Sequence, residues 1–178
     1  HQYGVALLND CKYGHKIHEN TIDLNLLRSP TDPDPDADQG RHEFTYALLP
    51  HTGKLIEADV ISEATQLNQP PAIFDGFRTA NVVPPVTVNG AGVALEVLKK
   101  AEKAECLVVR LVETRGCRTT AQVTLADPQA RLVECDLMEW QTLQNHGQST
   151  AEIAMAPFEI RTFMIVDGEQ LGLSEFTL

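Results

Sequence analysis

The stretch Leu107-Val-Val-Arg-Leu-Val-Glu-Thr-Arg-Gly-Cys-Arg-Thr-Thr-Ala-Gln-Val-Thr-Leu125 contains two short apolar runs separated by a charged turn with a glycine. In its second half, Ala121, Val123 and Leu125 alternate with polar residues. This period of two is typical of a strand with one face in a core. Similar runs occupy residues 93–97 and 133–137. Short apolar runs at this regular spacing predict a β-sandwich.

The same pattern continues on both sides of this stretch. Apolar residues recur through residues 153–166 and predict one long strand, or two strands broken near Pro157. The N-terminal third has an apolar run at residues 4–8, and apolar and polar residues alternate over residues 22–26 and 44–48. We therefore expect an all-β protein in which sandwiches provide the core.

One helix interrupts this β pattern. Ile56, Val60, Ala64 and Leu67 have helical spacing, and Asn68 followed by prolines supplies a stop. The sequence therefore predicts one short helix over about residues 57–68.

The domain boundary is expected in the turn-rich segment that follows the helix. Residues 75–92 are rich in glycine, proline and asparagine, with only brief apolar runs. We place the boundary near Asn89, which gives an N-terminal part of residues 1–88 and a C-terminal part of residues 89–178. At 178 residues, the chain is long enough to bury a core without a metal or a disulfide.

Charge excludes two classes of partner. The chain has 25 acidic and 14 basic residues, a formal charge of -11 and a pI near 4.9. Such a surface repels nucleic-acid phosphates and anionic lipids. No apolar run reaches the roughly 18 residues that a membrane-spanning helix needs. A soluble protein is expected.

The cysteines favour a reducing compartment. Cys11, Cys106, Cys117 and Cys135 are sparse, and none forms a CxxC pair or the dense spacing of a secreted disulfide scaffold. The first residues, starting at His1, show no signal peptide. Both observations predict free thiols and a cytoplasmic location.

Two groups of residues could be assembled into metal sites, but neither pattern demands one. The aspartates of residues 32–38, with Glu43, superficially match a calcium-loop spacing. Ala37 occupies the position that needs glycine, so a solvated acidic loop is expected instead. His15 and His18 could join Asp10 or Glu19 at zinc, yet their stretch reads as a turn rather than a helix that would bring both rings to one face.

Catalytic motifs do not stand out. The sequence has no GxSxG elbow, no phosphate-cradling glycine loop and no Cys/His nucleophile motif. Trp140, the only tryptophan, lies near Met138 and Leu143, and we expect it to fill a core rather than to form a sugar-stacking platform.

Three N-terminal motifs resemble a known family. They are Tyr3-Gly-Val-Ala-Leu-Leu-Asn-Asp-Cys-Lys-Tyr-Gly14, Leu24-Asn-Leu-Leu-Arg-Ser-Pro30 and Asp36-Ala-Asp-Gln-Gly-Arg-His-Glu-Phe-Thr-Tyr-Ala-Leu-Leu-Pro-His51. They closely resemble the C-terminal part of glycoside hydrolase family 38, the zinc-dependent class II α-mannosidases, and are most similar to its cytosolic and bacterial branch. The resemblance continues, less specifically and in the family's order, through residues 59–70, 95–102, 109–113, 135–139 and 157–161.

This resemblance implies a non-catalytic role for the chain. In the family, the nucleophilic aspartate, the general acid and the zinc ligands lie in N-terminal regions that have no counterpart here. Residues 1–88 would complete a large central sandwich and residues 89–178 would form a small terminal sandwich. The chain alone is expected to be inactive and to bind no cofactor. It would pack on the missing catalytic domain, which holds zinc or another divalent metal and performs retaining hydrolysis of α-mannosides. The chain could also contribute contacts to a homo-oligomer.

Arg28 is the one candidate site residue. By resemblance, it matches an arginine that related enzymes bring toward the substrate pocket, where a guanidinium could donate paired hydrogen bonds to sugar hydroxyls. The alternative is a strand-end arginine that bridges acids of the following loop.

Two further expectations distinguish a fragment of a larger enzyme from a freestanding module. A fragment that has lost its partner should expose a large apolar patch. The rival function is a freestanding carbohydrate-binding β-sandwich, which requires exposed aromatic side chains at a preformed site.

Overall fold

The computed structural model describes residues 3–76, 83–147 and 149–167, and these form two compact units, His1–Phe77 and Arg78–Leu178. Within the described ranges, no helix is long and apolar enough to cross a membrane.

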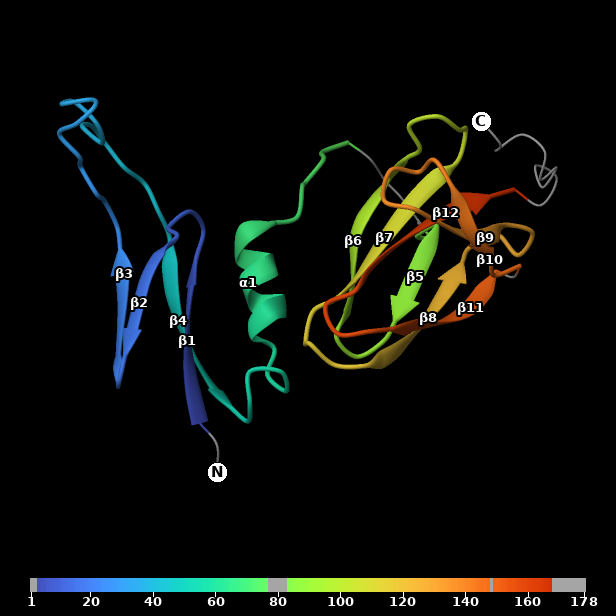
Figure 1. The fold of residues 1–178 in the computed structure, drawn as a ribbon, viewed down its shortest axis with the longest axis horizontal. Coiled ribbons are helices and arrows are strands. Elements are labelled where there is room, and N and C mark those ends of the chain that lie inside the picture. Colours follow the sequence, from blue (N-terminus) through green and yellow to red (C-terminus); the bar gives the residue numbers. More distant parts are fainter. Residues whose placement is uncertain (1–2, 77–82, 148, 168–178) are drawn as a thin grey trace. The chain divides into compact units, whose positions relative to one another are not determined.

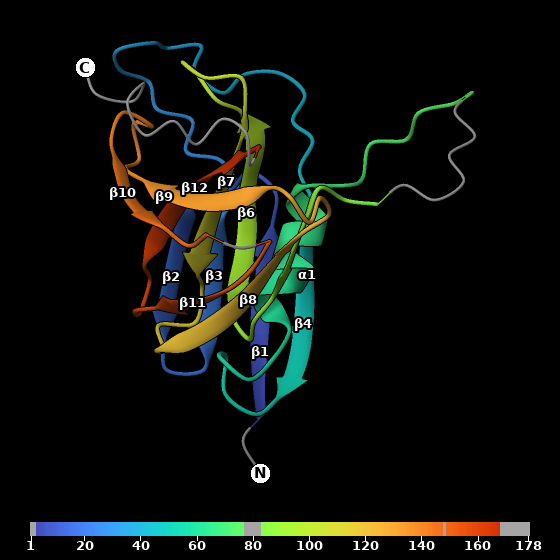
Figure 2. The ribbon, with the colours of Figure 1, turned by 90° about the vertical axis from the view of Figure 1, so that its right-hand side faces the viewer.

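The first unit contains two separate two-stranded sheets and one helix (Figure 1). Strand β1 (Tyr3–Asn9) pairs antiparallel with β4 (Tyr46–Thr52), and β2 (Gly14–His18) pairs with β3 (Thr21–Asn25). Helix α1 (Val60–Asn68) contacts β1 and lies beside it in Figure 2. The predicted short helix is thus present and begins three residues later than expected, at Val60.

The β1–β4 sheet has one uncovered apolar face. Directly paired residues of an antiparallel sheet share a face, and the register places Tyr3, Val5, Leu7, Tyr46, Leu48 and Pro50 together. All of these except Leu7 are exposed. On the opposite face, Gly4, Ala6, Leu8, Leu49 and His51 are half-buried. We call the exposed set the β1–β4 apolar face.

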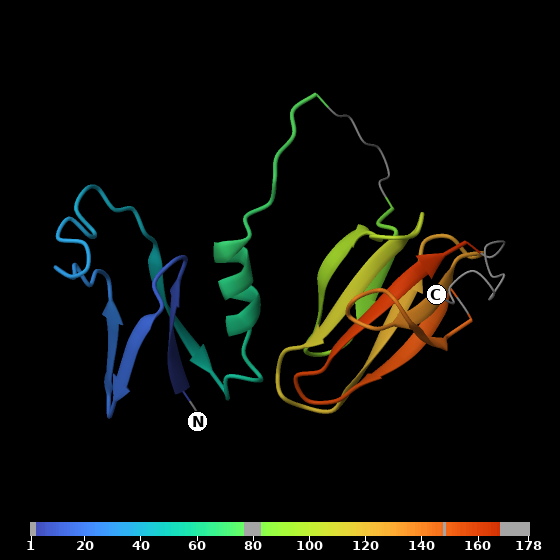
Figure 3. The same cartoon turned by 45° about the horizontal axis from the view of Figure 1, so that its top comes forward.

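The second unit is a β-sandwich (Figure 3). One sheet has the order β10-β9-β12-β7-β6 and the other has the order β11-β8-β5, with every pairing antiparallel. The strands are β5 (Val86–Asn89), β6 (Val93–Lys100), β7 (Leu107–Glu113), β8 (Thr119–Leu125), β9 (Arg131–Cys135), β10 (Thr142–Asn145), β11 (Thr150–Met155) and β12 (Ile160–Val166). The predicted all-β sandwich class with one short helix is confirmed.

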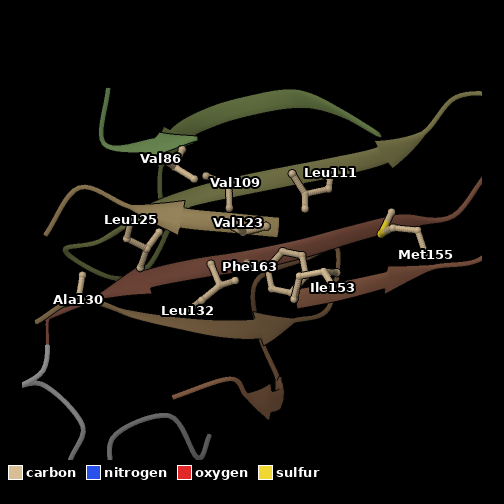
Figure 4. Packing of buried hydrophobic residues seen from close by; sticks show 10 residues of the cluster. All are labelled: Val86, Val109, Leu111, Val123, Leu125, Ala130, Leu132, Ile153, Met155 and Phe163. Carbon is tan, nitrogen blue, oxygen red and sulfur yellow. The ribbon is translucent and has the colours of Figure 1, made fainter. Parts of the chain in front are cut away.

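The main core lies between these two sheets. Figure 4 shows Leu111 of β7 and Phe163 of β12 packed with Ile153 of β11, and all three are fully buried. Alternate residues of β7, β8 and β11 enter this core, and those of β8 agree with the period of two in residues 119–125.

A second apolar cluster covers part of the outer face of the five-stranded sheet. Val108, Val133, Cys135 and Met164 are buried there, with Ala101 and Cys106 from the β6–β7 connection. All four cysteines are free thiols, and burial raises the pKa of Cys135 to about 12. This thiol is therefore inert at neutral pH.

The domain boundary differs from the sequence-based one. Strand β5 pairs with β8, Val86 lying opposite Leu125, so residues 86–88 belong to the second unit. The predicted boundary at residues 88/89 cuts this strand, and the compact units divide at 77/78 instead. Residues 168–178 of the predicted C-terminal part lie outside the described residues.

Candidate functional site

Arg28 lies in the segment that follows β3, and its residue is exposed. Among the described residues, no salt bridge joins Arg28 to an acid. Asp38 of the following acidic loop does not pair with Arg28. Its carboxylate accepts the backbone N–H of Ser29 at 2.8 Å. The alternative of a strand-end arginine that bridges the loop acids is therefore not observed, and the guanidinium remains available to another partner.

The acidic loop uses its carboxylates to fix its own turns. Asp34 accepts the N–H of Asp36 at 2.9 Å, and Asp36 accepts the side-chain amide of Gln39 at 3.0 Å. His42 Nε2 lies 2.8 Å from the carbonyl oxygen of Asp38. These side chains therefore cap local donors, as Asx turns do, rather than converge on one point.

The Asn9–Asp10 turn ties together three segments of the first unit. Asn9 Oδ1 accepts the N–H of Lys12 at 2.5 Å, a local turn contact, while Asp10 Oδ2 accepts the N–H of Thr45 at 2.9 Å. The Thr45 N–H also lowers the pKa of Asp10. Asn68 of α1 donates to the carbonyl of Asn9 at 3.2 Å. Asp10 is thus a long-range bridge, which single-sequence reasoning about turns could not foresee.

Among the described residues, His15 and His18 do not form a zinc site with Asp10 or Glu19. Residues 14–18 form strand β2 rather than a turn, so His15 and His18, three apart, point to opposite faces. His15 Nδ1 lies 3.1 Å from the carbonyl oxygen of Tyr13. Throughout the described ranges, no group of three or more His, Cys, Asp or Glu side chains could hold a metal ion.

A hollow in the first unit was not anticipated from sequence. It has a volume of about 530 Å³ and lies between β4 and the start of α1, lined by His51, Glu57, Asp59 and Glu63 among others. The buried Nδ1 of His51 has no hydrogen-bond partner among the residues that the structure describes. Another hollow, of about 520 Å³, lies at one end of the second unit, where Lys100 and Glu105 form an ion pair.

Trp140 does not fill a core. Its side chain is 51% exposed, and Lys103 Nζ lies 4.6 Å from the centre of its ring. Met138 and Leu143 are also exposed. The expectation for Trp140 is wrong, because the residue lies in the connection before β10, an edge strand whose four residues are all exposed.

Both units have sequence similarity to domains of one known protein family. The family model for the "Glycosyl hydrolases family 38 C-terminal domain" matches residues 1–36, and the model for the "Glycosyl hydrolases family 38 C-terminal beta sandwich domain" matches residues 92–163. Both matches come from one family, and they follow each other along the chain. The chain therefore belongs to the C-terminal β-domain region of glycosyl hydrolase family 38.

The similar proteins are much longer than this chain. Alpha-mannosidase 2C1 of Mus musculus is 37% identical over 172 residues, which is 92% of this chain and 17% of the relative. Alpha-mannosidase 2C1 of Homo sapiens is 36% identical, with 93% and 17% covered. An alpha-mannosidase of Saccharomyces cerevisiae is 30% identical, with 91% and 17% covered. The chain thus spans about a sixth of the length of the relatives it matches.

Proposed function

We propose that this chain is the non-catalytic C-terminal β-region of a retaining, zinc-dependent α-mannosidase, packed against the catalytic domain and bordering its active-site cleft. The observation that carries the proposal is the similarity to alpha-mannosidases over more than nine-tenths of the chain, at 30% to 37% identity. The substrate of the whole protein would be a terminal α-mannoside.

The first unit supports a structural role beside other polypeptide. Its two sheets have two strands each, and isolated two-stranded ribbons are at best marginally stable in water. The β1–β4 apolar face adds the exposed apolar patch that is expected of a region without its partner. Further strands of a central sandwich would pair with these ribbons and cover that face.

Zinc is assigned to the rest of the polypeptide. The described residues offer no set of three ligands for it, while zinc sites use at least three protein ligands. In this proposal, the residues that hold zinc therefore belong to the catalytic domain.

Arg28 is the residue of this chain that we place at the substrate side. Its exposure and its lack of an acidic partner among the described residues leave a guanidinium fork that can donate to sugar hydroxyls or to a carboxylate of the cleft. The free thiols are compatible with the cytoplasmic location that we propose for the whole enzyme.

The proposal is tested by comparing the longer gene product with this chain. With zinc present, the longer product should hydrolyse an aryl α-mannoside and release first the anomer with the substrate's own configuration, as NMR would show. The chain alone should release no mannose. Turnover by the chain alone would refute the non-catalytic assignment, and an inverted product would refute the retaining mechanism.

A freestanding carbohydrate-binding module is the alternative, and the exposure of Trp140 favours it. Aromatic rings are common sugar platforms, although Lys103 already occupies a position over this ring. Calorimetric titration of the chain with mannosides distinguishes the two functions. Saturable binding that Trp140→Ala abolishes would support the module.

A further inference from the structure

The connection between β9 and β10 has the reverse of the usual polarity of a surface loop. Leu137, Met138 and Trp140 are 51% to 57% exposed, while Glu139, which lies between them in sequence, is only 6% exposed. Leu143 of β10 is also exposed, at 62%. We call Leu137, Met138, Trp140 and Leu143 the 137–143 patch. In a loop that faces only water, the charged side chain would be exposed and the apolar side chains would be buried.

Glu139 holds this arrangement from beneath. Its carboxylate forms an ion pair with Lys99 at 2.8 Å and accepts the backbone N–H of Glu102 at 3.1 Å. Its backbone has a φ of 62°, a left-handed conformation that is costly for a residue with a side chain. The ion pair with Lys99 and the hydrogen bond from Glu102 fix the loop to the end of β6 and to the β6–β7 connection.

Asp136 and Arg110 fix the rest of the loop. Asp136 Oδ1 accepts the N–H groups of Trp140 and Gln141 at 2.7 and 3.1 Å, and the Asp136 N–H donates to the carbonyl of Gln141 at 3.0 Å. Arg110 of β7 donates to the carbonyl of Leu137 at 3.1 Å. The loop therefore lies against the outer face of the five-stranded sheet, where Figure 3 shows the β9–β10 connection. Its backbone is ordered before any partner arrives, which reduces the entropy lost on binding.

We propose that the 137–143 patch is a preformed docking site for the preceding polypeptide of the same family-38 protein. This inference rests on the proposed function, because it takes the chain to be part of a longer enzyme. Tryptophan is among the residues that dominate interface energies, and methionine is enriched at interfaces and adapts to irregular surfaces. The partner surface is thus apolar and belongs to one of the domains that precede this chain.

The choice of this occupant over a second copy follows from length and charge. The relatives are about six times longer than the matched region, so most of their surface is absent here. A second copy would bring a further formal charge of -11 toward the first, and like charges oppose such an encounter. The β1–β4 apolar face shows that the first unit also lacks apolar cover.

Methionine oxidation tests the proposal within one molecule. Met138 is exposed, whereas Met155 and Met164 are 2% and 3% exposed and serve as internal references. Under dilute peroxide, Met138 of the 178-residue chain should oxidise quickly. In the longer gene product, peptide mass spectrometry should show Met138 oxidising at least about tenfold more slowly, because a docked partner excludes the oxidant.

Two variants of the longer product sharpen this test. Leu137→Asp should return Met138 to the oxidation rate of the shorter chain, while the matched change Ile73→Asp, at an exposed residue outside the patch, should not. In the shorter chain, Leu137→Asp should leave the melting temperature unchanged, which shows that the sandwich still folds.

Four other outcomes would overturn the inference or separate it from the proposed function. Equal oxidation rates in the two proteins would refute docking. Protection of the shorter chain that grows with its concentration, together with a dimer mass, would assign the patch to a second copy and refute the chosen occupant. Mannosidase activity is measured in parallel: an active longer product with exposed Met138 refutes only the docking site, and an inactive product with protected Met138 refutes only the proposed function.

Discussion

The carboxylate of Glu113 accepts the backbone N–H of Phe158 at 2.9 Å, across 45 residues of sequence. The same side chain accepts the N–H groups of Arg115, Gly116 and Cys117 at 2.8, 2.7 and 3.2 Å. Glu113 is 1% exposed, so one buried carboxylate joins the turn after β7 to the turn before β12.

Replacing this carboxylate should destabilise the second unit. Glu113→Gln offers these four N–H groups a neutral amide in place of two charged oxygens, and we expect the free energy of unfolding to fall by about 2 to 4 kcal/mol. Urea unfolding at neutral pH measures the change. Glu152→Gln, at an exposed position of β11, is the control and should change stability by less than about 0.5 kcal/mol. Equal effects of the two changes would contradict this role for Glu113.

The stabilisation by Glu113 should also depend on pH. Burial alone would raise the pKa of Glu113, but the four backbone N–H donors together lower it below its usual value. Since the pKa is lower in the folded state, the contribution is complete above the unfolded pKa of about 4.3 and is lost as pH falls through the folded value. The stability difference between wild type and Glu113→Gln should therefore shrink below about pH 4. Urea midpoints at several pH values measure it, and parallel pH curves would show that the carboxylate does not titrate in this way.

Gly116 should resist any side chain. Its φ is 70°, and an added Cβ would lie 2.6 Å from the ring of Phe158. Gly147 has a similar φ of 67°, but an added Cβ would meet only Asn145 Oδ1, at 3.9 Å. Gly116→Ala should cost about 1 to 3 kcal/mol of unfolding free energy, and Gly147→Ala about 1 kcal/mol, because only the first adds a clash to the backbone strain. Equal losses would mean that the Phe158 ring moves aside freely.

Arg28 should affect catalysis by the longer gene product without affecting its fold. Arg28→Ala is expected to lower kcat/KM for an aryl α-mannoside by about tenfold or more, because a charge-assisted hydrogen bond to the substrate side is lost. Arg28→Lys should restore only part of the activity, since an ammonium lacks the paired donors of a guanidinium. Arg41→Ala is the control, because Arg41 pairs with Glu43 on the exposed loop. Unchanged kcat and KM for Arg28→Ala would remove Arg28 from the substrate side.

The sequence predicted the sandwich strands with strong apolar alternation and missed β2 and β10, in which every residue is exposed. Residues 119–125 alternate strictly because one face of β8 enters the core. By contrast, β2 and β10 have no buried residue, so no hydrophobic period marks them. Residues 153–166 left open one long strand or two strands broken near Pro157, and the structure has two. That β11 and β12 belong to different sheets depends on long-range pairing with β8 and β7.

The site was less predictable than the fold. The family resemblance selected Arg28 as a candidate. Only the structure shows that the carboxylate of Asp38 accepts the backbone N–H of Ser29 rather than pairing with Arg28. The inverted β9–β10 loop was missed because Glu139 reads in sequence as an ordinary surface charge. Its burial requires Lys99 of β6 and the N–H of Glu102 in the β6–β7 connection, both distant in sequence.

The ribbon of β1 and β4 carries a hazard as well as a binding surface. Within the described part of the chain, each of these strands pairs only with the other, so each has one row of backbone donors and acceptors without a strand partner there, beside an exposed apolar face. Such edges template pairing with other chains. A proteolytic piece that released this ribbon from its surroundings would therefore assemble edge to edge and precipitate, whereas the C-terminal sandwich, with its own core, would remain dispersed.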